Sequence, residues 1–81
     1  MKHYVVVLDW ATDEGESVQI LGVAHTIEEA KEIFNQHLAE QKEFAEENGY
    51  DIDIDTETRF DSGVMGYWRI EHTTLYIQEV K

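Results

Sequence analysis

The sequence contains no cysteine and no proline, and only six of its 81 residues are lysine or arginine. Without cysteine there is no disulfide framework, no thiolate nucleophile and no cysteine-based zinc site, which is typical of a reducing cytosol. The longest apolar run near the start, residues 4–8, is too short for a signal sequence or a membrane span. These absences predict a cytoplasmic protein.

The scarcity of basic residues sets the charge. Eighteen acidic residues give a formal net charge of −12, which is large for this length. A field of this sign repels nucleic acid and anionic membranes, and it attracts basic proteins. We therefore expect no direct nucleic-acid or membrane partner.

The length and the apolar content predict one small folded domain over residues 1–81. Apolar residues make up 42% of the chain, with two Trp, four Tyr and three Phe, which is enough for a packed core and argues against disorder. A chain of this size has room for one hydrophobic core. No repeat or linker divides it.

The clearest local pattern predicts an amphipathic helix over residues 26–48. Thr26 and Glu29 have the spacing of a capping box at a helix start, and Gly49 supplies the left-handed residue that ends many helices. Apolar residues recur between them every three or four positions, which is typical of one helical face. The core-facing residues of this helix are predicted to be Ile33, Phe34 and Leu38.

Five strands are predicted around this helix. Residues 4–10 are apolar on both faces and predict an interior strand, with a turn at 13–16 and a second strand at 18–23. Further strands are predicted at 50–58, 65–71 and 75–80, with turns at 61–63 and 72–73. The helix is expected to pack on Val6, Leu8 and Ile20. The order ββαβββ predicts an α+β fold with one helix on one face of a mainly antiparallel sheet.

Metal and catalytic motifs are incomplete. The alternation of Asp51, Asp53 and Asp55 resembles the start of a calcium loop, but Thr56 and Ser62 stand where such a loop needs Gly and Glu. We expect a single row of solvated carboxylates on one strand face, which also protects that strand from aggregation. The four histidines have no helical metal-binding spacing, and neither Ser17 nor Ser62 has a nucleophile motif. No metal, cofactor or catalytic residue is therefore predicted.

The charge distribution predicts the function. Seven acidic residues and no basic residue lie between positions 43 and 57: Glu43, Glu46, Glu47, Asp51, Asp53, Asp55 and Glu57. We expect a non-enzymatic binding module, an accessory protein or inhibitor that docks a basic partner through this acidic face. Two alternatives stay open. The acids serve only solubility, or the chain is a small catalytic or ligand-binding domain with carboxylates in a cleft.

The aromatic stretch near residue 67 predicts self-association. Tyr67 and Trp68 would point to opposite faces of a strand, and a single helical layer can cover only one of them. A homodimer would cover the other side chain. Because both copies carry −12, such a dimer is expected to tighten as salt rises.

Overall fold

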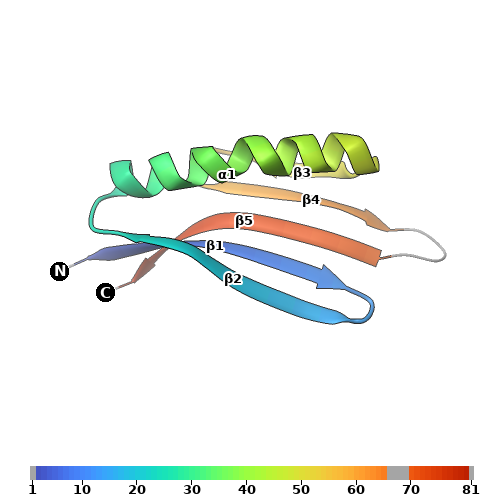
Figure 1. Cartoon of the computed structure of the whole chain (residues 1–81), viewed down its shortest axis with the longest axis horizontal. Helices are drawn as coiled ribbons and strands as arrows, with labels where there is room; N and C mark the ends of the chain where they lie inside the picture. The colour runs from blue at the N-terminus through green and yellow to red at the C-terminus, as the bar shows by residue number, and fades with distance from the viewer. Residues whose placement is uncertain (1, 66–69, 81) are drawn as a thin grey trace.

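The described part of the chain forms one antiparallel five-stranded sheet with one long helix across one face (Figure 1). The computed structural model describes residues 2–65 and 70–80. Within them the strand order across the sheet is β2-β1-β5-β4-β3. The α+β class and the order ββαβββ are confirmed. The elements are β1 (His3–Thr12), β2 (Gly15–Ala24), α1 (Ile27–Asn48), β3 (Asp51–Asp55), β4 (Arg59–Met65) and β5 (Ile70–Val80).

Helix α1 begins and ends where the sequence predicts. The hydroxyl of Thr26 accepts a hydrogen bond from the amide of Glu29 at 3.2 Å, which satisfies one free donor of the first turn. Gly49 adopts the left-handed conformation, with φ 68°, and the amide of Tyr50 then donates to the carbonyl of Ala45 at 2.8 Å. This is the Schellman arrangement, which glycine favours because it has no Cβ to clash.

The hydrophobic core lies between α1 and strands β1, β5 and β4. Phe34 is the largest residue of the helix inside it, and its side chain is fully buried. It lies in one cluster with Val6 of β1 and Leu75 of β5, which are side chains on the same face of the sheet. The fully enclosed cluster consists of Val6, Ala24, Ala30, Phe34, Phe60 and Leu75. Ile33, Leu38 and Leu8 pack against this cluster, as predicted.

The predicted contact of the helix with Ile20 is wrong. Val6 pairs with Gly22 and Val7 pairs with Ile20, so Leu21 is an extra residue in β2. Such a bulge shifts the alternation of side chains by one. Leu21 therefore packs against the core, and Ile20 lies on the opposite face with 64% of its surface exposed.

Two predicted turns are wrong, because the segments lie inside strands. Residues 61–63 belong to β4 and residues 72–73 to β5, and residues 61–63 pair with residues 72–74 across the ladder. The predicted strand 65–71 includes the last residue of β4 and the first two of β5, and its residues 66–69 lie outside the described residues. Ser62, Thr73 and Thr74 are buried. Packing between interior strands outweighs the turn-like composition of this segment.

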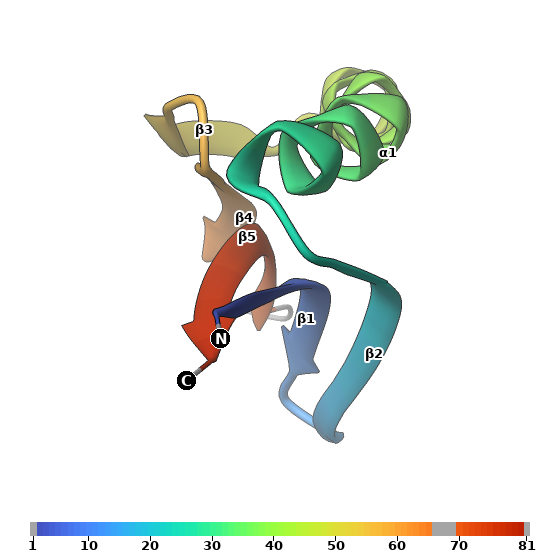
Figure 2. The ribbon, with the colours of Figure 1, turned by 90° about the vertical axis from the view of Figure 1, so that its left-hand side faces the viewer.

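The second face of the sheet has no helix over it in the described part of the chain (Figure 2). We call it the uncovered face. It carries Val18, Ile20 and Val23 of β2, which are 58%, 64% and 63% exposed. β2 stands at one edge of the sheet, so these side chains border both water and an unpaired strand edge.

Candidate acidic binding site

The molecule is elongated, and nine of its eighteen acidic residues lie at one end. The Cα atoms extend over 46 × 22 × 15 Å. The β1–β2 turn, the C-terminus of α1 and the start of β3 lie at the same end (Figure 1). We call this region the acidic end. Its carboxylates come from Asp13, Glu14, Glu16, Glu43, Glu46, Glu47, Asp51, Asp53 and Glu71.

A shallow hollow lies on the β1–β2 turn at this end. Its volume is about 500 Å³, and it is open to solvent. The turn beneath it is held by Thr12, whose hydroxyl accepts from the amide of Glu14 at 3.2 Å and donates to the carbonyl of Gly15 at 3.3 Å. The hollow is lined by Trp10, Thr12, Asp13, Glu14, Gly15, Glu16, Ser17 and Glu71. Four of these side chains are carboxylates, so the hollow favours a cation.

Trp10 joins this hollow to an apolar cleft under the helix. The cleft has a volume of about 150 Å³ and is lined by Leu8, Trp10, Gln41, Phe44 and Thr73. Trp10 shares the core-facing side of β1 with Leu8, yet it is 46% exposed. Phe44 is 38% exposed and stacks edge-on against Tyr50, with ring centroids 5.4 Å apart. An indole with both an apolar and an acidic neighbour suits an amphipathic cationic group.

The C-terminus of α1 adds to the negative field. Its last turn contains no basic residue, and Glu43, Glu46 and Glu47 are all exposed there. The unsatisfied carbonyls of a helix end carry partial negative charge in the same place. The carboxylates and the helix dipole therefore favour a cation bound near this terminus.

The predicted single row of aspartates on β3 is wrong. Ile52 pairs with Ser62 and Ile54 with Asp61, so β3 has one extra residue between them. Since paired residues share a face, this irregularity places Asp51 and Asp55 on opposite faces. No residue of β3 is buried.

The structure separates the seven predicted binding residues into two groups. All seven are exposed. Asp55 pairs with Lys42 of the helix at 3.3 Å. Glu57 pairs with Lys31, also of the helix, at 3.2 Å. Among the described residues, the other five form no ion pair: Glu43, Glu46, Glu47, Asp51 and Asp53. These five belong to the acidic end.

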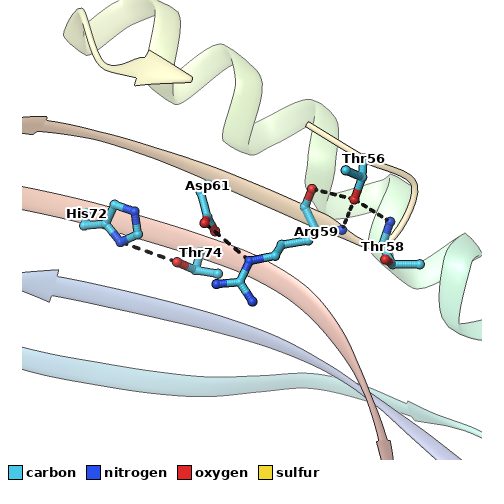
Figure 3. Close-up of polar contacts among 6 residues, drawn as sticks. All are labelled: Thr56, Thr58, Arg59, Asp61, His72 and Thr74. Atoms are coloured by element: carbon cyan, nitrogen blue, oxygen red, sulfur yellow. Dashed lines mark hydrogen bonds and ion pairs between the residues drawn. The ribbon is translucent and has the colours of Figure 1, made fainter. Parts of the chain in front are cut away.

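A second polar group crosses the uncovered face (Figure 3). Arg59 Nε donates to Asp61 Oδ2 at 3.3 Å, and Thr74 Oγ1 lies 3.4 Å from His72 Nδ1. Asp61 is only 5% exposed, and its Oδ1 has no hydrogen-bond partner among the described residues. The ion pair offsets part of the cost of burying this carboxylate between β4 and β5.

The turn between β3 and β4 is also polar (Figure 3). Thr56 Oγ1 accepts from the amides of Thr58 and Arg59 at 3.3 and 3.0 Å, and it donates to the carbonyl of Arg59 at 3.2 Å. These bonds satisfy the backbone of the turn locally. They position Arg59 at the start of β4, from which it reaches Asp61.

The histidines do not form a metal centre in the described part of the chain. His3 and His25 stack edge-on with centroids 5.2 Å apart, and His37 Nδ1 lies 3.8 Å from Glu40. Residues 2–65 and 70–80 contain no group of three or more His, Cys, Asp or Glu side chains placed to hold an ion.

The helix α1 in this range is not long and apolar enough to cross a membrane.

Sequence reasoning missed the residues of the hollow and cleft. Trp10 belongs to the predicted interior strand 4–10, Phe44 lies on the apolar face of the predicted helix, and the acids at 13–16 are predicted only as a turn. The signal available in the sequence is the density of carboxylates next to a tryptophan at the strand end. Tyr67 and Trp68, the residues of the self-association hypothesis, lie outside the described residues.

Comparisons with known proteins give no family or relative. No protein-family model, no curated protein and no solved structure matches this chain.

Proposed function

We propose that this domain is a non-enzymatic protein-binding module whose acidic end docks a basic segment of a partner protein. The observation that carries the proposal is the acid-lined hollow beside the half-exposed indole of Trp10. The hollow, the cleft and the helix terminus together offer negative charge, an aromatic face and an apolar recess. A partner segment with Arg or Lys next to an apolar residue has side chains that complement each of these three properties.

The chemistry of recognition follows from the lining. A guanidinium or ammonium group over the Trp10 ring gains a cation–π interaction, and the carboxylates of the turn accept its hydrogen bonds. A neighbouring apolar side chain enters the cleft beside Phe44. The net charge of −12 steers the partner before contact, so salt is expected to slow association.

The exposure of the carboxylates favours binding over catalysis. Asp13, Glu14 and Glu16 all lie in water. General acid catalysis at neutral pH needs a carboxyl group held in an apolar setting. A second candidate function uses the same hollow, since its volume of about 500 Å³ also suits a small cationic molecule. Such a ligand would leave the apolar cleft empty.

The test uses a short synthetic peptide of alternating Arg and Leu, titrated into ¹⁵N-labelled protein. We expect the peptide to shift the Trp10 indole resonance and the amide resonances of the β1–β2 turn. The affinity for the peptide should fall as salt rises. The triple variant D13N/E14Q/E16Q should lower the affinity about tenfold, at about 0.5 kcal/mol for each exposed charge contact. Arginine amide alone, as a second probe, separates a small-molecule site from a peptide site.

The matched control is E28Q/E32Q/E40Q, which removes three exposed carboxylates elsewhere along α1. Both triple variants have the same net charge. If both triple variants lose the same affinity for the peptide while circular dichroism shows that both are folded, binding depends only on the net charge. The acidic end is then not a specific site.

A further inference from the structure

The outer edge of β2 is an unprotected strand edge. β2 is the first strand in the sheet order and bonds only β1, so the backbone groups along its other side have no strand partner in the described residues. It is ten residues long, and Glu16 is its one charged residue. Long, uncharged strand edges readily pair with another strand, and most proteins protect them with lysine, proline or short length.

The opposite edge shows that protection. β3 is five residues long, three of its residues are aspartates, and an irregularity interrupts its pairing. Each of these features discourages a further strand from adding. The two edges of one sheet therefore differ, and only β2 is fit for pairing.

The absence of charge along β2 favours a second copy of the chain as the partner. Residues 17–27 contain no Asp, Glu, Lys or Arg, which makes them the longest uncharged run in a chain of net charge −12. A basic partner gains nothing here and is attracted to the acidic end instead. A copy of the chain brings the same uncharged edge, so no like charges need face each other at the contact.

We propose that the protein forms a symmetric homodimer in which the β2 strands of two copies pair antiparallel. A two-fold axis perpendicular to the sheet at Gln19 places Val18 of one copy opposite Ile20 of the second. Both side chains lie on the uncovered face, where each is more than half exposed in the single chain. Glu16 lies outside the paired residues and does not face another acid. The result is a continuous ten-stranded sheet with both helices on the same side.

The dimer is weak. The bulge at Leu21 bends β2, so the paired segment is short, and it is centred on residues 17–21. Its buried area falls below the roughly 1,200 Å² of stable complexes. Repulsion between two chains of −12 adds to this, and salt screens that repulsion. We therefore expect dimers at high protein concentration, with the dimer fraction rising with salt.

The experiment is sedimentation equilibrium of the full chain at about 0.05 and about 0.5 M NaCl, combined with amide hydrogen exchange. We expect a monomer–dimer equilibrium and slower exchange of amides in residues 17–21 as protein concentration rises. Ile20→Lys should weaken dimerisation at least about tenfold, because symmetry places the change twice in each dimer.

Ile52→Lys is the matched control. Ile52 is 51% exposed on the other edge strand, and its substitution changes the net charge equally. A dimer unaffected by Ile52→Lys and lost in Ile20→Lys supports the proposal. A protein that stays monomeric at about 1 mM in high salt would overturn it. So would equal effects of the two variants on dimerisation, or amide exchange rates at residues 17–21 that do not change with protein concentration. Binding of Arg–Leu peptides at the acidic end is unaffected by any of these outcomes.

Discussion

Replacing Phe34 by alanine tests the core that joins α1 to the sheet. The side chain is fully buried in the cluster with Phe60 and Leu75. Burying a phenylalanine contributes about 1.5–3 kcal/mol, and the cavity left by its removal brings the loss to about 3–5 kcal/mol. At roughly 0.05–0.15 kcal/mol per residue, 81 residues have a stability of about 4–12 kcal/mol. Phe34→Ala therefore removes a large share of the free energy of unfolding.

The assay is urea unfolding followed by far-ultraviolet circular dichroism, with the slope m compared between variants. Phe44→Ala is the control, because it makes the same change on the same helix at a residue that is 38% exposed. We expect it to cost about 1–2 kcal/mol, since much of its ring is already in water. If Phe34→Ala loses no more than Phe44→Ala at equal m, Phe34 does not lie in the core.

Two further stability measurements follow from local geometry. A Cβ at Gly63 would lie 2.5 Å from a backbone oxygen of β5, so Gly63→Ala should cost about 3 kcal/mol in urea unfolding. A Cβ at Gly22 would meet the flexible end of Ile33 at 2.9 Å, so Gly22→Ala should cost about 1 kcal/mol, and equal losses would contradict this comparison. Thr26→Ala removes the cap bond of α1 and should cost about 1 kcal/mol of stability, which lowers the melting temperature by about 4–8 °C. Thr26→Ser keeps a hydroxyl at the cap and should retain most of this stability.

The helix was predictable because its determinants are local. The spacing of Thr26 and Glu29 and the glycine at position 49 act within one turn of the chain. The periodicity between them identified Phe34 as a core residue, which is confirmed. The face of Ile20 was not predictable, because one extra residue in β2 reverses the alternation and no local pattern marks the bulge.

The strands β4 and β5 were misplaced because the ladder that makes β5 an interior strand joins it to β1, which is distant in sequence. Residues 61–63 have turn composition, but as strand residues they are enclosed between β3 and β5. The hollow and the cleft were missed for a similar reason. Trp10 is 46% exposed although its strand is interior, and the acids of the first turn, the helix end and β3 come to the same end of the molecule only when the chain folds.

The place of β5 in the sheet has a consequence for how the protein is made. β5 follows every other strand in sequence, yet it pairs with β1 on one side and β4 on the other. Before it is synthesised, the β1–β2 and β3–β4 hairpins share no ladder, and Phe34 lacks the cover of Leu75. Isolated hairpins are marginally stable in water. We therefore expect the complete sheet to form on the ribosome only after β5 has left the exit tunnel.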